Sequence, residues 1–120
     1  MSACFIVRAQ LADGSVKDAF DRWYEKEHLP DAMQAFGATG AWRGWSDIDP
    51  SVHLAVYEFD DIAKVRAIPG SETLKRLVAD FDRAWGEKVV RTREAERVVQ
   101  RVGRDPEPAI IRRCSAPAAR

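Results

Sequence analysis

The order in which hydrophobic patterns follow one another constrains the fold of this chain more than any single motif does. Segments whose apolar residues recur at every second position, which is typical of β-strands, alternate with segments that have the spacing of an amphipathic helix. The clearest strand is VHLAVYEF at 52–59. The predicted strands lie at 4–11, 39–48, 52–59 and 94–102, and the predicted helices run from Asp13 or Ser15 to near His28, over 61–67 and over 71–86.

This β-α-β-β-α-β order predicts an α+β protein of ferredoxin-like fold, in which a four-stranded antiparallel sheet carries its helices on one face. The 120 residues suffice for one domain, to which we assign residues 1–103. From Gly103 onward the sequence GRDPEPAIIRRCSAPAAR has no sustained period and many small or helix-breaking residues. We therefore interpret 104–120 as a C-terminal arm or disordered tail.

A proline near the end of the first helix predicts where that helix ends. The residue before a proline is disfavoured in helical geometry, and Pro30 follows Leu29 directly. We therefore expect the helix to stop or bend near His28, and 31–36 to form another short helical turn that Gly37 ends.

Both faces of the predicted sheet carry large apolar side chains. On strand 52–59, for example, Val56 falls on one face and Tyr57 on the other. Helices can cover only one of these faces, and a monomer would expose the other as a large apolar patch, which soluble proteins avoid. The sequence therefore predicts a twofold homodimer in which two sheets stack face to face around a barrel-like core.

The composition argues against several classes of partner. Lys and Arg total 19, as do Asp and Glu, whereas nucleic-acid-binding proteins usually have a basic excess. No apolar run approaches the ~20 residues of a transmembrane helix, and the N-terminal MSACFIVRAQ does not resemble a signal peptide. Cys4 and Cys114 do not form a disulfide framework. We therefore expect a cytoplasmic protein with no nucleic-acid or membrane partner.

Three stretches of the chain give a resemblance to a known superfamily. The helix ending in FDRWYEKEHLP at 20–30 and the strands GAWRGW and VHLAVYEFDD resemble the dimeric α+β barrel superfamily over about residues 1–103. The branch that they resemble most is the EthD-like group, in which an aromatic-rich first helix runs into a histidine followed closely by proline. The superfamily includes cyclases, isomerases, quinone-forming and haem-degrading monooxygenases, and members without an assigned activity, so the resemblance implies function only loosely.

Tyr24 and His28 are the candidate catalytic residues. They are four positions apart, as are Phe20 and Tyr24, so the three side chains form one row if the helix persists. A histidine beside a phenol can act as a general acid or base near neutral pH. The resemblance also favours His28 as the residue of the pocket. The alternative is a histidine that only interacts with the dipole at the helix end.

Four further residues are candidates for substrate binding, and each has a structural alternative. Arg8 interrupts an apolar strand and could hold an anionic ligand or form an ion pair at a subunit interface with Glu58 or Glu96. Trp45 and Tyr57 could line a pocket for an aromatic molecule or simply fill the core. His53 could line a pocket or be a polar residue near a strand end.

The sequence leaves two functions open. The first is a small enzyme that needs no cofactor and uses a histidine acid/base on a hydrophobic, oxygenated small molecule, as an isomerase, cyclase or monooxygenase. The second is a non-catalytic dimer that binds a ligand or is associated with stress. We expect no metal site, since Glu27, His28 and Asp31 are not a dense ligand array. Haem held by His28 is an alternative that the resemblance keeps open.

Overall fold

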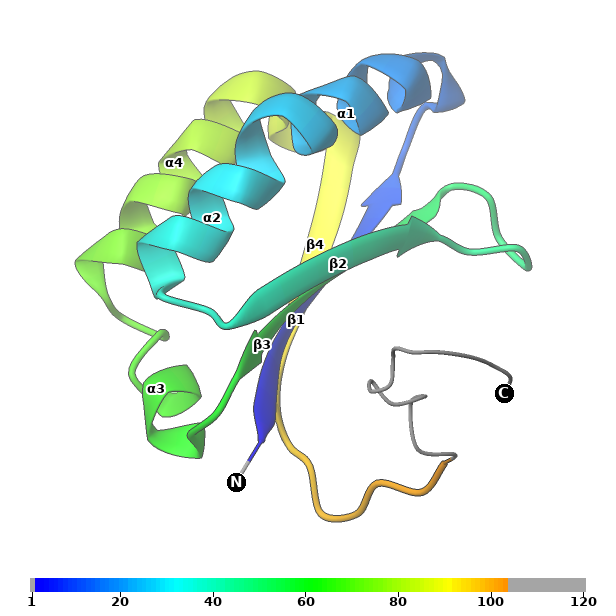
Figure 1. Cartoon of the computed structure of the whole chain (residues 1–120). Helices are drawn as coiled ribbons and strands as arrows, with labels where there is room; N and C mark the ends of the chain where they lie inside the picture. The colour runs from blue at the N-terminus through cyan, green and yellow to red at the C-terminus, as the bar shows by residue number, and fades with distance from the viewer. Residues whose placement is uncertain (1, 104–120) are drawn as a thin grey trace.

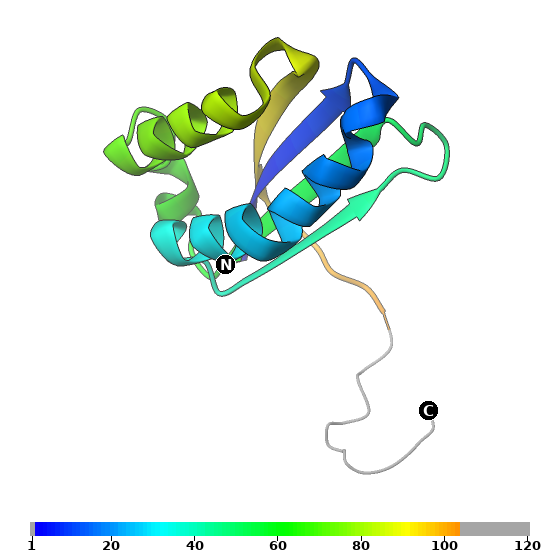
Figure 2. The ribbon, with the colours of Figure 1, turned by 90° about the horizontal axis from the view of Figure 1, so that it is seen from above.

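The computed structural model describes residues 2–103, and the predicted arm or tail at 104–120 lies outside them. One four-stranded antiparallel sheet has the order β2-β3-β1-β4, and the helices lie on one face of it (Figures 1 and 2). The predicted ferredoxin-like fold is therefore confirmed. The strands are β1 (Ala3–Leu11), β2 (Gly40–Trp45), β3 (Val52–Phe59) and β4 (Val89–Arg97), and the α-helices are α1 (Lys17–Trp23), α2 (Leu29–Phe36), α3 (Ile62–Arg66) and α4 (Glu72–Trp85).

The two central strands, β1 and β3, separate the helix-covered face of the sheet from its open face. Phe5 and Val7 of β1 are buried beneath the helices, whereas Arg8 is exposed on the open face. Tyr57 of β3 lies opposite Phe5 in the same buried layer. The alternation predicted for both strands is confirmed, and the strand predicted at 52–59 has the observed bounds.

The first helical region does not end before its proline. A π turn at Tyr24–His28 joins α1 to α2, and the N–H of Leu29 donates to the carbonyl oxygen of Tyr24, five residues earlier. In a regular α-helix the ring of Pro30 would collide with the carbonyl group four residues before it, and the wider turn relieves this collision. The expectation that Leu29 leaves helical geometry was wrong, because the inserted residue keeps the chain helical past His28.

Capping groups fix the ends of the helical segments at the predicted positions. The carboxylate of Asp13 accepts the N–H of Ser15 at 2.9 Å, at the start of a short 3-10 turn, Gly14–Val16, that leads into α1. Gly37 ends α2 with a left-handed φ of 70°, which glycine adopts at little cost. The hydroxyl of Ser71 caps α4.

The last strand begins earlier than predicted. We expected it at 94–102, but β4 spans Val89–Arg97. A short 3-10 turn, Gly86–Lys88, follows α4 and returns the chain to the sheet at once. β4 is an edge strand with many charged residues, so its apolar residues do not recur at every second position. Backbone hydrogen bonds to β1 hold it in the sheet.

The other predicted boundaries differ by a few residues. β2 ends at Trp45, three positions before the predicted end, because the hydroxyl of Ser46 accepts the N–H groups of Ile48 and Asp49 and starts the turn. The short helix predicted at 61–67 is α3. Within residues 2–103, no helix combines the length and the apolar character that spanning a bilayer requires.

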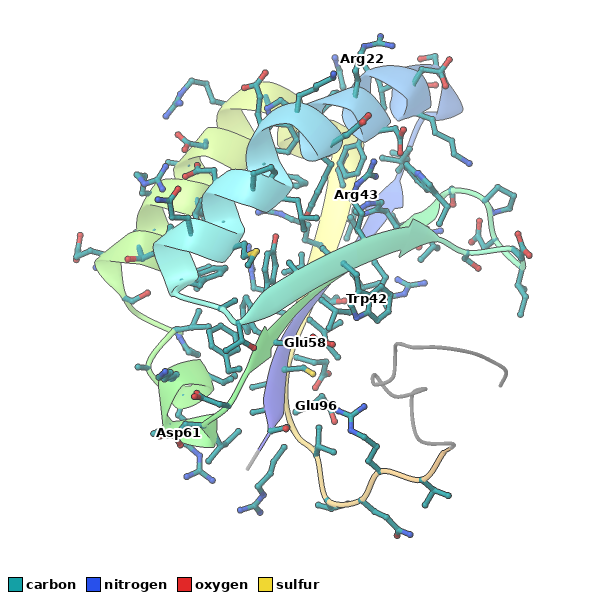
Figure 3. All side chains as sticks on the ribbon, in the orientation of Figure 1. Arg22, Trp42, Arg43, Glu58, Asp61 and Glu96 are labelled. Carbon is teal, nitrogen blue, oxygen red and sulfur yellow. The ribbon has the colours of Figure 1, made fainter. Side chains whose placement is uncertain are left out.

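The open face of the sheet has apolar residues at its centre. Val56 lies there between Ile6 and Trp42, its neighbours on β1 and β2. Trp42 is 49% exposed although it is one of the largest side chains. Figure 3 shows Trp42 on the side of the sheet away from the helices, together with Glu58 and Glu96. No helix among residues 2–103 covers this face.

Candidate active site

His28 lies at the end of the π turn, among aromatic rings. It is 8% exposed, and the indole of Trp23 stacks on its imidazole at 4.5 Å and 15°. Tyr24 and Phe81 meet the same imidazole edge-on, at 5.0 and 5.7 Å between ring centroids. Trp23 precedes His28 by five residues, and the π turn, whose backbone bond also spans five residues, brings these two rings together. The predicted neighbourhood of Tyr24 and His28 is observed.

His28 forms part of the wall of two hollows. The outer groove, which lies between the first helical region and α4, has a volume of about 340 Å³. The inner cavity, which lies between the helices and the sheet, has a volume of only about 20 Å³, enough for one water molecule. The outer groove is lined by Trp23, Glu27, His28, Asp31, Asp80, Arg83 and Ala84. Since His28 lines both spaces, a change in its rotamer would alter both.

Neither ring nitrogen of His28 has a hydrogen-bond partner within residues 2–103. Burial lowers the pKa of His28 to about 4, against a weaker opposing effect of the Asp31 carboxylate. At neutral pH the imidazole is therefore uncharged and can accept a proton. If His28 has the predicted acid/base role, the neutral ring would start as a base, and a weak one until negative charge develops nearby.

Two phenols enter the inner cavity beside His28. Burial raises the pKa of Tyr24 to about 12 and raises that of Tyr57 further. The two hydroxyl groups interact, and their interaction favours ionisation of Tyr24 over that of Tyr57. Tyr57, predicted from sequence to bind substrate, therefore lines the cavity with Tyr24 and His28.

Two arginines of β4 complete the polar part of the cavity lining. The guanidinium of Arg91 lies 3.9 Å from the centroid of the Phe81 ring and pairs with Asp82 at 2.6 Å. Arg93 is exposed but also borders the cavity. The remaining lining is apolar apart from His28 and the two tyrosines: Phe5, Val7, Ala32, Phe36, Leu74, Leu77, Val78 and Phe81.

His53 lies on the other side of Tyr24, at 4.4 Å between ring centroids, and is fully buried. Its Nε2 is 3.3 Å from Nη1 of Arg43, which also donates to Asp21 at 2.8 Å. Because arginine can only donate, Nε2 accepts and the ring proton belongs on Nδ1, which is buried without a partner among the described residues. Burial, reinforced by Arg43, lowers the pKa of His53 to about 4.

The other predicted binding residues lie away from the two hollows. Trp45 donates its indole N–H to Asp21 at 2.8 Å, and so belongs to the His53 cluster. Arg8 is exposed on the open face of the sheet. Glu58 and Glu96 both lie opposite Cys4, four residues along β1 from Arg8. Neither glutamate is therefore a cross-strand neighbour of Arg8 within one chain.

Sequence reasoning missed Trp23 as a partner of His28 and missed both β4 arginines. In a regular α-helix, with 3.6 residues per turn, two side chains five positions apart point to different sides of the helix. Only the π turn brings Trp23 and His28 together. Arg91 lay before the predicted strand, and Arg93 next to its start. A strand beginning at Val89 would have placed both arginines on the face that carries Val7.

The surroundings of His28 do not fit a haem. The indole of Trp23 covers one face of the imidazole, and the inner cavity is far smaller than a porphyrin. The outer groove is lined by Glu27 and by Asp31 and Asp80, whose carboxylates are already paired with arginines, and its lining shows no second ligand for a haem iron. Within residues 2–103, no three His, Cys, Asp or Glu side chains form a group that could hold a metal ion.

Comparison with known proteins identifies the fold. No family model and no curated protein matches the sequence. Among solved structures, an EthD-family protein from Bacillus halodurans is 17% identical with a TM-score of 0.59, and the match covers 82% of this chain and 100% of that one. SnoaB, a cofactor-independent oxygenase from Streptomyces nogalater, is 10% identical with a TM-score of 0.58, over 86% of this chain and 98% of its own.

A dimeric ferredoxin-like protein from an uncultured marine organism is similar as well. It is 14% identical with a TM-score of 0.52, and the match covers 84% of this chain and 98% of that one. At such low identity these likenesses concern the fold. They confirm the predicted ferredoxin-like fold.

Proposed function

We propose that this chain is a small enzyme that needs no cofactor, binds a hydrophobic, oxygenated small molecule beside His28 and removes a proton from it. The observation that carries the proposal is the position of an unpartnered imidazole in the wall shared by the outer groove and the inner cavity. The groove, at about 340 Å³, has the size of a small-ligand site. The likeness in fold to a cofactor-independent oxygenase supports the same class of activity.

The proton transfer can be written with the side chains present. A ring nitrogen of neutral His28 takes a proton from a carbon next to a carbonyl group, and the electron pair of that C–H bond moves onto the carbonyl oxygen. The hydroxyl of Tyr24 and the positive charge of Arg91 line the inner cavity, and they stabilise this oxygen when a change in the rotamer of His28 joins the cavity to the groove. Tyr57 lines the same cavity as Tyr24.

Isomerases, cyclases and monooxygenases can share this first step. An isomerase returns the proton to a different atom, and a cyclase uses the carbanion to form a carbon–carbon bond. A monooxygenase passes the electron-rich anion to dioxygen, so that a CH₂ group becomes a carbonyl group and the second oxygen atom leaves as water. The choice among the three depends on the substrate.

Hydrogen exchange on a simple ketone tests the proposed base. β-Tetralone is an aromatic ketone with acidic protons next to its carbonyl group, and their exchange in heavy water can be followed by NMR. We expect the protein to accelerate the exchange and His28→Gln to abolish the acceleration. Glu25→Gln, an exposed change on the same π turn, is the matched control. Equal rates for wild type and His28→Gln would remove the proposed mechanism.

One observation favours the alternative of a non-catalytic ligand-binding protein. The inner cavity holds no more than a water molecule, and Trp23 covers one face of His28. A protein that binds β-tetralone, as measured by calorimetry, but leaves its exchange rate unchanged would fit this alternative.

We also propose that two copies associate through the open face of the sheet. The apolar centre around Val56 and Trp42 supports this arrangement, as does the separation of Arg8 from the acidic end of the face at Glu58 and Glu96. Antiparallel stacking of two such faces brings each arginine to the acidic end of the other copy.

Sedimentation tests this association. We expect a dimer for the wild type, and a monomer for Trp42→Glu because the change puts a charge at the apolar centre. Arg22→Glu, on the outer side of α1 (Figure 3), should remain a dimer. A monomeric wild type at micromolar concentration would contradict the proposal.

A further inference from the structure

The outer groove has one carboxylate without a counter-charge. Arg76 pairs with both Asp31 and Asp80 at 3.0 Å. Arg83 pairs with Asp80 at 3.0 Å as well. Glu27, the third acid of the lining, is exposed and has no ion pair or hydrogen bond within residues 2–103. Three carboxylates against two guanidinium groups therefore leave the groove with one negative charge in excess.

Glu27 lies where its own helical segment offers it no cation. The residues three and four positions away are Trp23, Tyr24, Pro30 and Asp31, and none of them is basic. Asp31 is itself an acid, and like charges four residues apart on a helix repel each other. A cation bound in the groove would relieve this repulsion and supply the missing counter-charge.

A second observation marks the groove as a place for a ligand. His28 lines it and is only 8% exposed, and its ring nitrogens have no partner within residues 2–103. In contrast to Nδ1 of His53, these nitrogens are not among the fully buried polar atoms of the same range. Trp23 and Ala84 supply the apolar part of the lining. One molecule in the groove can therefore meet a carboxylate, a neutral imidazole and an apolar wall.

The two hollows that His28 lines differ in charge. Arg91 and Arg93 border the inner cavity and no carboxylate does, whereas acids outnumber bases in the lining of the outer groove. The inner cavity, at about 20 Å³, has room for a single oxygen atom, and a ring has to stay in the groove. This arrangement favours a molecule that points a carbonyl oxygen inward and carries positive charge at its outer end.

We propose that the substrate is a hydrophobic ketone that carries a protonated amine, and that Glu27 binds the ammonium group in the outer groove. This inference rests on the proposed function, because it directs the carbonyl group of that substrate toward His28 and the inner cavity. Glu27 takes no part in the proton transfer. It binds and orients the substrate by the end opposite the carbonyl group.

The test compares three probes that share a ring and differ in charge. Naphthylmethylamine is a cation at neutral pH, naphthylmethanol is uncharged and naphthoate is an anion. We expect calorimetry on the full 120-residue chain at low ionic strength to give a Kd about fivefold lower for the amine than for the alcohol, since an exposed ion pair is worth at most about that factor. Naphthoate should bind most weakly. In Glu27→Gln the preference for the amine should fall to about twofold or less, because only the amine loses its partner.

Glu25→Gln is the matched control, because it removes the same charge from an exposed residue of the same π turn that does not line the groove. It should keep the full preference for the amine. Equal Kd values for amine and alcohol, tightest binding of naphthoate, no binding of any probe, or an equal loss in Glu25→Gln and Glu27→Gln would overturn the inference.

The exchange of β-tetralone, which has no amine, separates this inference from the proposed function. Exchange that depends on His28, without a preference for the amine, would reject this inference alone. A preference for the amine that depends on Glu27, without any acceleration of exchange, would reject the proposed proton transfer and leave Glu27 as the ammonium site.

Discussion

The two histidines of this chain are buried in the same helix-covered layer and differ in what they can do there. Burial lowers the pKa of both His28 and His53 to about 4. His53 is fully buried and is tied to Arg43, which Asp21 holds in place (Figure 3 shows Arg43 between β2 and α1). His28 has no such partner and borders both hollows. The lowered pKa therefore shows only that each histidine is buried. His28 is the candidate site because it also lines the groove and the cavity, where a small molecule could reach it.

Acid should destabilise the protein through both histidines, which is the largest effect that we expect. The folded pKa of each is about 4, below the ordinary value of 6.5, so the unfolded chain binds more protons between these pH values. Stability from this source is complete above about pH 6.5 and is lost as the pH falls toward 4, by about 3 kcal/mol for each histidine. Urea unfolding between pH 7 and 4.5 measures it.

Single substitutions separate the two contributions to acid sensitivity. His28→Gln and His53→Gln should each remove about half of the pH dependence that the histidines cause, since each deletes one titrating group. A pH dependence that neither variant reduces would mean that carboxylates dominate the acid response, and it would break the proposed similarity of the two histidines.

Substitution of only one of the two histidines should change the rate of proton transfer. His28→Gln should slow the exchange of β-tetralone by about 100-fold or more, the usual contribution of a positioned general base. His53→Gln should leave the rate within about threefold, because His53 does not border either hollow described. Near-ultraviolet circular dichroism of both variants checks that the aromatic core is intact. A larger loss of rate in His53→Gln would transfer the catalytic role to the Arg43 cluster.

Some features of the fold and of the candidate site could be predicted from the sequence, and others could not. The fold and the proximity of Tyr24 and His28 were predictable, because period-two and helical patterns are local and both residues lie on one helix. The π turn was not, since propensity rules foresee an end or a bend at Pro30 and do not foresee a residue inserted before it. The cavity arginines were hidden because β4 is paired by backbone bonds and carries no apolar alternation.

The pH profile of the exchange reaction should distinguish the buried His28 from an ordinary exposed histidine. A base with a pKa of 6.5 would be about nine-tenths protonated at pH 5.5, and the rate would fall about tenfold from its value at pH 8. With the pKa of His28 near 4, the value of kcat/KM should stay level over this range, because the imidazole remains neutral in the free enzyme. An inflection near pH 6.5 would show that His28 is solvated.

The smallest expected effect concerns the partner that only His53 has. Arg43→Gln removes a positive charge beside His53 and so should raise its pKa, while the pKa of His28 stays unchanged, because Arg43 is not among the groups that shift it. NMR titration of the two imidazole rings measures both values in one sample. The loss of the ion pair with Asp21 should cost about 1 kcal/mol or less, since the Asp21 side chain is 43% exposed. Equal shifts of both histidines would show that one electrostatic cluster includes the two, and that the separation of the candidate site from the Arg43 cluster is wrong.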